Sequence, residues 1–329
     1  MKNYLKILAQ GKHLDQSEAK SLILQMTNGK TDPNLIAAIL MAYHLMSPNL
    51  DEIKGFRQGL YERTEIIDLS SYNPMDMCGT GGDGKDTLNI STLASFVASS
   101  CGIPIAKHGN YGSSSVCGSS NVLEYLGYKF KKDSEALNAE MDANQICFIH
   151  APLFHPSLKN VATIRKALGI KTLFNILGPL VNPCQPKIQS SGVFNLDTMR
   201  QYHYLLQDTH EKHCIVHSMD GYDEISLTGK FKLLSSGGEF VFHPNDLDLS
   251  IVQHQDIRGG TSIKDSAAMF IKVLKGKGTT MQNSVIAINA AVAMHCYDPS
   301  KTIQSYHENA LECILSGKPY TQLTKTINQ

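Results

Sequence analysis

The sequence lacks any long uninterrupted apolar run. No segment approaches the roughly 18 consecutive apolar residues that a membrane-spanning helix needs, and no charged start leads into a secretory-type apolar stretch. Thirty Lys and Arg balance thirty Asp and Glu, so the net charge is zero and there is no surplus of positive charge for a polyanion. We therefore expect a cytoplasmic protein that binds neither a membrane nor nucleic acid, with any affinity for phosphate confined to a local site.

Cysteine pairs of the CxxC kind are also absent. The eight cysteines are scattered, mostly among apolar or glycine-rich residues, and this argues against a zinc site or a disulfide framework. Thirteen histidines are present, but His213 and His217 alternate with apolar residues as in a strand and lack the spacing of a zinc-binding helix. A histidine-based metal site is not expected.

The pattern of apolar residues changes once along the chain. The first seventy residues contain only helical patterns, with start signals such as Asp15 followed by Glu18, and Pro33 in a first turn. From about Tyr72, short apolar runs alternate with helical patterns, which indicates a mostly parallel sheet covered by helices. The predicted strands span residues 75–78, 103–106, 146–150, 188–194 and 214–217, and residues 231–234 and 240–242 predict an antiparallel hairpin.

One glycine-rich stretch, MDMCGTGGDGKDTLNIST at residues 75–92, follows the first predicted strand. Ligands of open α/β sheets bind beyond the carboxyl ends of strands. There, the N–H groups of four glycines and the start of a helix near Ser91 can surround an anion. The spacing matches neither GxxxxGK[ST] nor GxGxxG. The stretch predicts a phosphate or diphosphate site, and a purely structural turn is the alternative.

A second loop strengthens this prediction. The segment AKHGNYGSSSVCGSSNVLEYLG places Lys107, His108, Asn110 and five serines in a glycine-containing loop before a helix. Hydroxyl and amide groups suit phosphate oxygens, and a lysine neutralises their charge. The alternative is a pair of solvated loops rich in turn-forming residues.

Two further segments carry charged residues at positions where they can bind a metal ion or a substrate. In MDGYDEIS, Asp223 and Glu224 follow the strand predicted at 214–217, and paired carboxylates there suit a magnesium ion that phosphate oxygens also bind. Arg165 lies on a helical face ahead of a loop at Gly178 and Pro179. Its guanidinium either binds a carboxylate bidentately or lies in solvent.

Taken in order and spacing, GTGGDG, NIST, KHGN, GSSNVLE, HPSLKNV, FNILGPLVNP and DGYDEIS resemble the anthranilate phosphoribosyltransferases. The resemblance implies a nucleoside phosphorylase/phosphoribosyltransferase-like architecture: a helical domain at 1–71, joined by helices from about 158–185, and an α/β domain at 72–329. It implies a homodimer that transfers phosphoribose from PRPP to the amine of anthranilate and uses magnesium, in two ions, while pyrophosphate is released.

The resemblance also implies residue roles. Lys107, Asp223 and Glu224 are implied as catalytic, and Ser91, Asp223 and Glu224 as metal ligands. The implied anthranilate contacts are Gly79, His108, Asn110, His155, Arg165 and Gly178. The implied PRPP contacts are Gly79, Gly82, Asp83, Thr87, Asn89, Ile90, Ser91, Thr92, Lys107, His108, Gly109, Asn110, Tyr111, Gly112, Ser113, Ser114, Ser115 and Ser119.

Some residues depart from the family pattern, and rival functions exist. Tyr111 and Asn121 stand where the family often has Arg and Asp, which bears on phosphate affinity and loop geometry. A pyrimidine nucleoside phosphorylase would carry a KHSTGG-type loop where this chain has KHGNYG. A relative without anthranilate specificity is disfavoured by Arg165, Asn110 and the Gly178 loop, and a nucleic-acid-binding module is disfavoured by the zero net charge.

Overall fold

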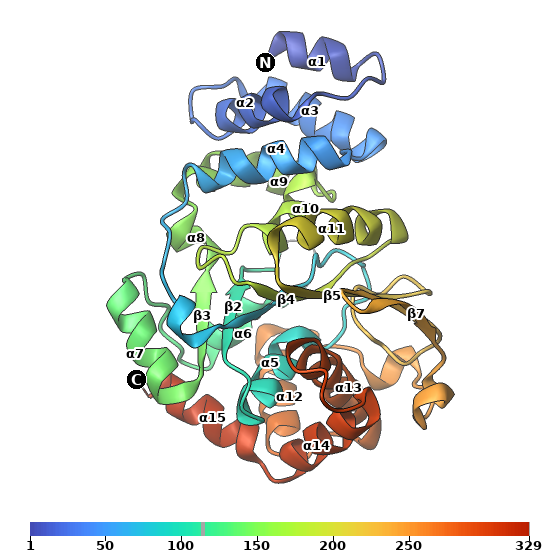
Figure 1. Ribbon diagram of the computed structural model, residues 1–329. Coiled ribbons are helices and arrows are strands. Elements are labelled where there is room, and N and C mark those ends of the chain that lie inside the picture. Colours follow the sequence, from blue (N-terminus) through green and yellow to red (C-terminus); the bar gives the residue numbers. More distant parts are fainter. Residues whose placement is uncertain (113–115, 329) are drawn as a thin grey trace. The chain divides into compact units, whose positions relative to one another are not determined.

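The computed structural model describes residues 1–112 and 116–328 (Figure 1). The chain forms two compact units: one comprises Met1–Ile67 and Ala151–Gln185, and the other Asp68–His150 and Pro186–Gln329. The first segment therefore ends at Ile67, where the sequence predicted 71, and the returning segment begins at Ala151, where it predicted about 158. The predicted contacts Ser113, Ser114 and Ser115 lie outside the described residues.

The first unit is helical. Its helices are α1 (Lys2–Leu8), α2 (Gln16–Met26), α3 (Pro33–Met46), α4 (Leu50–Tyr61), α8 (Ala151–Phe154), α9 (Lys159–Leu168) and α10 (Leu173–Leu177), with short 3-10 helices at Pro156–Leu158 and Gly178–Leu180. Asp15 and Glu18 form the capping box that starts α2. Helix α4 starts at an Asn49 cap, two residues before the predicted Asp51. A Cβ added at Gly55 of α4 would lie 2.2 Å from the Gln16 carbonyl oxygen, so glycine permits the close approach of α2 and α4.

The second unit is built on a seven-stranded sheet with the order β3-β2-β1-β4-β5-β6-β7. The strands are β1 (Met75–Met77), β2 (Ile105–Gly109), β3 (Ile146–His150), β4 (Ile188–Gly192), β5 (Lys212–Ser218), β6 (Phe231–Ser235) and β7 (Gly238–Phe242). The first five run parallel, and the hairpin β6–β7 is antiparallel. The predicted helical domain plus mostly parallel α/β domain is thus confirmed. The strand order reverses at β1, between β2 and β4, which is where open α/β sheets bind ligands.

Helices cover both faces of this sheet (Figure 1). They are α5 (Ile90–Ser100), α6 (Ser119–Tyr125), α7 (Ser134–Asn144), α11 (Leu196–Thr209), α12 (Ile263–Leu274), α13 (Thr280–Tyr297), α14 (Ile303–Leu315) and α15 (Lys318–Ile327). Helix α13 packs against α5 and α14 and is buried along most of its length, mainly through Ala, Val and Ile side chains. In the part of the chain that the structure describes, no helix is both long and apolar enough to cross a membrane.

The start of β2 corrects one prediction. The predicted strand at 103–106 begins only at Ile105, because the Ile103 N–H completes the end of α5 by donating to the Ala98 carbonyl and Pro104 has no N–H. The strand then continues to Gly109. Lys107 and His108 are consequently buried strand residues, and the prediction that they lie in the following loop is wrong.

A buried carboxyl in α7 makes stability depend on pH. Glu140 is fully buried; its Oε2 accepts a hydrogen bond from the Tyr128 hydroxyl at 2.8 Å, whereas its Oε1 has no hydrogen-bond partner among the described residues. Burial raises the pKa of Glu140 to about 7, although Tyr128 and Lys131 oppose the rise. The folded protein therefore holds a proton that the unfolded chain releases above about pH 4.5. Stability should fall as pH rises from that value to about 7.

We expect Glu140→Gln to remove this loss. The difference in free energy of unfolding between the variant and wild type should grow by about 1 to 3 kcal/mol in favour of the variant from about pH 5 to about pH 8, because only wild type loses stability. Chemical unfolding at the two pH values measures the difference, and any constant effect of the amide cancels. Glu135→Gln, an exposed change on the same helix, is the control and should follow the wild-type curve. A pH-independent difference for Glu140→Gln would contradict the prediction.

Candidate active site

The glycine-rich loop joins β1 to α5. Gly81, Gly82 and Gly84 have φ values of 62°, 76° and 73°, a left-handed conformation that side chains disfavour. A Cβ added at Gly81 or Gly84 meets nothing within 4 Å, so these two glycines serve the backbone conformation rather than space. The helix after the loop begins at Ile90, one residue before the predicted start, and presents its N-terminus to the same region.

The loop after β5 brings the predicted carboxylates to this glycine loop. The Gly81 N–H donates to Asp223 Oδ2 at 2.6 Å, and a Cβ at Gly79 would lie 3.2 Å from the same oxygen. Lys85 Nζ lies 4.7 Å from the centroid of the Tyr222 ring, which gives the two loops a second contact. The two predicted motifs, 142 residues apart, therefore form one site.

Gly192, at the end of β4, permits this approach. A Cβ at Gly192 would lie 1.6 Å from the Asp223 carbonyl oxygen, a separation that no atom pair can adopt. Gly192 was not among the residues predicted from the sequence. The available signal was a glycine near the end of a predicted strand, which often marks a close approach of another backbone.

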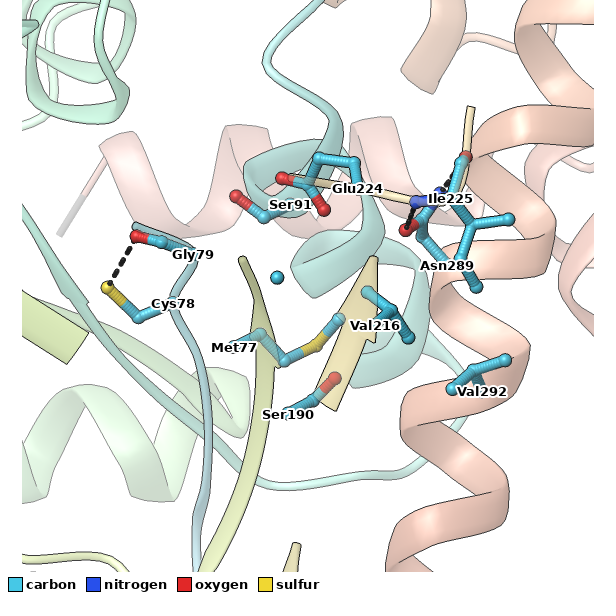
Figure 2. A pocket seen from close by; sticks show the side chains of 11 residues that line it. Met77, Cys78, Gly79, Ser91, Ser190, Val216, Glu224, Ile225, Asn289 and Val292 are labelled. Carbon is cyan, nitrogen blue, oxygen red and sulfur yellow. Dashed lines mark hydrogen bonds between the residues drawn. The ribbon is translucent and has the colours of Figure 1, made fainter. Parts of the chain in front are cut away.

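Lys107 connects β2 to the neighbouring elements. Its Nζ donates to the Met77 carbonyl oxygen of β1 and to Ser91 Oγ of α5 at 3.3 Å, and the side chain is only 2% exposed. Figure 2 shows Ser91, Glu224 and Gly79 around one pocket, with Asn289 of α13 hydrogen-bonded to Ile225, the residue after Glu224. A buried ammonium group thus lies among the residues predicted to bind phosphate and metal.

The negative charges of the carboxyl groups in this site are only partly balanced by positive charge. Burial, and then the neighbouring Glu224 and Asp83, hold the pKa of Asp223 well above its usual range. Burial also raises the pKa of Glu224 to about 7, although Lys107 and Ser91 oppose the rise. Asp83 Oδ2 is buried without a hydrogen-bond partner among the described residues. Carboxylates held together in this way favour a cation between them.

The described residues contain no group of three or more His, Cys, Asp or Glu side chains that could hold a metal ion by themselves. This arrangement is compatible with magnesium, which usually takes one or two carboxylates and completes its octahedron with water and substrate phosphates. Asp223, Glu224 and Ser91 are the groups of this chain that fit such a site.

The loop after β2 is held by amide groups. Asn121 Oδ1 accepts from the N–H groups of Gly112 and Gly118 at 2.9 and 3.0 Å, and thereby brings the two ends of the loop together. The Asn110 carbonyl oxygen accepts from Ser119 Oγ at 3.2 Å. Tyr111 packs edge-on against the His150 ring, with the centroids 4.8 Å apart. Asn121, which departs from the family pattern, therefore closes the loop without adding a charge.

Other predicted PRPP residues lie around these loops. Asn89 Nδ2 donates to the Cys117 carbonyl oxygen at 2.8 Å and so joins the two loops. Ile90 and Thr92 are buried in the first turn of α5. Thr87 pairs with Arg258 in an isolated β-bridge.

The strand β1 contributes a buried acid that was not among the site residues predicted from the sequence. Asp76 is fully buried, and its Oδ1 accepts from the His108 backbone N–H at 3.1 Å. A strand this short, with one acid between two methionines, offers no local signal that the acid supports the next strand.

Three predicted anthranilate residues, His155, Arg165 and Gly178, belong to the helical unit. Both ring nitrogens of His155 are engaged there: Nδ1 with Thr64 Oγ1 at 2.9 Å and Nε2 with the Val181 carbonyl oxygen at 2.9 Å. Burial lowers the pKa of His155 to about 4, so its ring is neutral. The arrangement gives His155 a clear structural role, and its contact with anthranilate stays a prediction.

Arg165 lies on α9 with its guanidinium carbon 5.3 Å from the centroid of the Phe174 ring. Burial lowers the pKa of Arg165 from its ordinary value, but a guanidinium remains charged in proteins. Within the described residues, Arg165 forms no ion pair with a carboxylate. A half-buried guanidinium of this kind is suited to an external carboxylate.

Comparison with known proteins assigns the class. Residues 71–320 match the family model described as "Glycosyl transferase family, a/b domain", and residues 2–64 match "Glycosyl transferase family, helical bundle domain". The two matches together define a glycosyl transferase with a helical domain and an α/β domain.

The relatives narrow the class. The chain is 50% identical to the anthranilate phosphoribosyltransferase of Flavobacterium psychrophilum, over 99% of this chain and 98% of the relative, and 45% identical to that of Cytophaga hutchinsonii, over 99% and 100%. The chain belongs to the anthranilate phosphoribosyltransferase family.

Solved structures agree with the relatives. The Thermus thermophilus anthranilate phosphoribosyltransferase has a TM-score of 0.89 and 28% identity, covering 99% of this chain and 98% of that one. The Saccharomyces cerevisiae enzyme in complex with PRPP and Mg has a TM-score of 0.89 and 26% identity, covering 99% and 96%.

Proposed function

We propose that this protein transfers the 5-phosphoribosyl group of PRPP to the amine of anthranilate, giving N-(5-phosphoribosyl)anthranilate and pyrophosphate. This is the second step of tryptophan biosynthesis from chorismate. The observation that carries the proposal is the meeting of the glycine loop, Lys107 and the Asp223–Glu224 pair at the carboxyl ends of parallel strands. The likeness to yeast structures with PRPP and Mg, and with 4-fluoroanthranilate, supports both substrates.

We propose Asp223, Glu224 and Ser91 as the residues that hold magnesium, in two ions. The buried Asp83 oxygen without a hydrogen-bond partner and the raised pKa values of Asp223 and Glu224 support a cation at this place. When bound, magnesium neutralises the charge that develops on the departing pyrophosphate. Calorimetric titration of magnesium in the presence of PRPP gives the number of ions directly.

The chain's own groups supply orientation and charge. Substitution at the anomeric carbon breaks a C–O bond to pyrophosphate, forms a C–N bond to the amine, and builds up oxocarbenium character. Lys107, which lies beside Ser91, and the N–H groups of the glycine loop are proposed to stabilise the leaving group, because fixed charges and dipoles are most effective where charge develops. Holding both reactants in line supplies much of the remaining reduction in barrier.

The amine needs no strong base. The aryl amine of anthranilate is neutral near pH 7, so it attacks directly and loses its proton to solvent as the C–N bond forms. We assign His108, which is buried on β2, to packing and polar contact rather than to obligatory proton transfer.

The direct test is consumption of anthranilate, followed by its fluorescence, in the presence of PRPP and magnesium. We expect consumption that depends on all three components. Persistence of anthranilate while another amine or a nucleobase is consumed would overturn the substrate assignment. The proposal of a homodimer rests on the family resemblance, and sedimentation equilibrium tests it. The cytoplasmic location stays an expectation from the sequence.

The carboxylate of anthranilate is proposed to pair with Arg165. A charged hydrogen bond is worth about 1.5 to 3 kcal/mol, so Arg165→Ala should raise the KM for anthranilate about ten-fold to a hundred-fold and leave the KM for PRPP nearly unchanged. Arg165→Lys should restore only part of the loss, because an ammonium group lacks the planar fork and stacks less well on Phe174. Steady-state kinetics with each substrate varied in turn measures both values.

Two controls test the pairing. Lys166→Ala removes a positive charge from an exposed neighbour on α9 and should leave both KM values unchanged. Aniline lacks the carboxylate, so Arg165→Ala should hardly change its slow turnover. Equal losses with anthranilate and aniline would show that Arg165 supports structure rather than the substrate carboxylate.

A further inference from the structure

Asn289 lies near the middle of the apolar helix α13 and is only 6% exposed. Its Nδ2 donates to the Ile225 carbonyl oxygen at 2.8 Å and to the Val285 carbonyl oxygen at 2.8 Å. Its Oδ1 accepts from the Ile225 N–H at 3.0 Å (Figure 2). Both amide hydrogens and the oxygen are thus engaged, which holds the amide plane in one orientation.

The backbone that Asn289 binds belongs to the loop after β5 that carries Asp223 and Glu224, which we call the carboxylate loop. Ile225 directly follows Glu224, and its side chain is fully buried. Ser218, at the end of β5, provides a second anchor, since its Oγ donates to the Glu224 carbonyl oxygen at 2.7 Å. Ser218 belongs to the strand that the loop leaves, whereas Asn289 comes from a helix 64 residues later. Asn289 therefore ties the loop to the helical layer under the sheet.

The chemistry of this contact is specific to an amide. Asn offers a donor and an acceptor side by side and so matches the N–H and C=O groups of one residue, as a neighbouring strand does. Alanine, the most frequent neighbour on this helix, would leave the N–H and C=O of Ile225 buried without these partners, at a cost in free energy. Aspartate keeps the size but offers no donor when ionised.

We infer that Asn289 is a positioning residue: by holding the backbone at Ile225, it places Asp223 and Glu224 in the arrangement that receives the divalent cation together with the PRPP diphosphate. The inference rests on the proposed function. It extends the site to a residue outside the glycine-rich and acidic motifs. Substitution of a group that orients a metal ligand typically weakens metal affinity or lowers activity about 10- to 100-fold.

Helix α13 offers a matched control. Asn283 lies on the same helix, is 4% exposed, and its Nδ2 donates to the Gly278 carbonyl oxygen at 3.4 Å. Asn283→Ala therefore removes a buried amide from α13 without touching the carboxylate loop. A comparison of the two positions separates loss of positioning from loss of helix packing.

The test uses the full chain and Mn²⁺ as a paramagnetic stand-in for magnesium. In the presence of PRPP, electron paramagnetic resonance should show Mn²⁺ affinity about 10- to 100-fold weaker in Asn289→Ala and Asn289→Asp than in wild type, and unchanged in Asn283→Ala. Hydrogen exchange of peptides spanning residues 219–228 should be faster in the Asn289 variants alone. The KM for anthranilate at saturating metal should stay constant in all of them.

Two results would overturn the inference. One is Mn²⁺ affinity in Asn289→Asp within about threefold of wild type. The other is an equal loss in Asn283→Ala. The aspartate variant preserves side-chain volume and decides the matter where the alanine variant fails to fold. A wild-type protein that leaves anthranilate unconsumed would contradict the proposed function instead, and the exchange data would still report on the anchor.

Discussion

Turnover should fall about 1,000-fold or more in the double variant Asp223→Asn, Glu224→Gln, because the charge on departing pyrophosphate then lacks its compensation. The two amides keep the size and most hydrogen-bonding capacity of the acids. In Asp223→Asn, the amide oxygen can still accept the hydrogen bond from the Gly81 N–H. The predicted loss is therefore one of charge at the reaction centre. Single-turnover kinetics with saturating magnesium and PRPP measures it.

Stability provides the check on this result. Both acids have a raised pKa in the folded protein, so their ionisation opposes folding near neutral pH, and removing it should leave the free energy of unfolding equal to or above that of wild type. Asp220→Asn, on an exposed residue of the same loop, is the matched control and should retain normal turnover. A double variant with turnover close to wild type at limiting magnesium would refute the metal role.

Gly192→Ala is expected to lower kcat/KM about 100-fold, because the added Cβ lies 1.6 Å from the Asp223 carbonyl oxygen and the carboxylate loop has to move away from the glycine loop. Both atoms in this clash are held by backbone, so no side-chain rotation relieves it. The same strain should lower the free energy of unfolding by about 1 to 3 kcal/mol. Kinetics and chemical unfolding of the same preparation measure the two effects.

Gly229→Ala is the control for this substitution. Gly229 lies in the same unit, a Cβ there meets nothing within 4 Å, and its φ is not in the left-handed region. It should retain both activity and stability. Normal activity in Gly192→Ala, or an equal loss in Gly229→Ala, would show that the close approach of β4 to the carboxylate loop is not needed for catalysis.

The local elements of this protein could be predicted from the sequence because their determinants lie within a few residues. The capping box of Asp15 and Glu18 starts α2, and Pro33 begins α3. The alternation of short apolar runs with helical patterns after Tyr72 corresponds to the parallel strands β1 to β5. The prediction of a phosphate site in the loop after β1 was likewise local, since it rested on glycines and small polar residues that lie close together in the sequence, and three of these glycines are left-handed in the structure.

The environment of each predicted site residue depends on parts of the chain that are distant in sequence. Lys107 and His108 look like loop residues in sequence, yet pairing of β2 with β3 extends the strand over them and buries both. His155 was predicted from its sequence motif to contact anthranilate, but both of its ring nitrogens form hydrogen bonds within the helical unit. Burial and strand pairing depend on neighbours that are distant in sequence.

The sequence by itself therefore determined the kinds of element and their order, and it predicted which loops bind phosphate and metal. Only the tertiary structure decided that Gly81 meets Asp223 across 142 residues, that Gly192 makes room for this contact, and that Asn289 holds Ile225. A glycine at a strand end or an asparagine in an apolar helix has the same local pattern whatever lies opposite. The contact that such a residue makes is set only by the folded chain, in which burial of the core offsets the entropy lost on ordering and brings β1, β4 and β5 together.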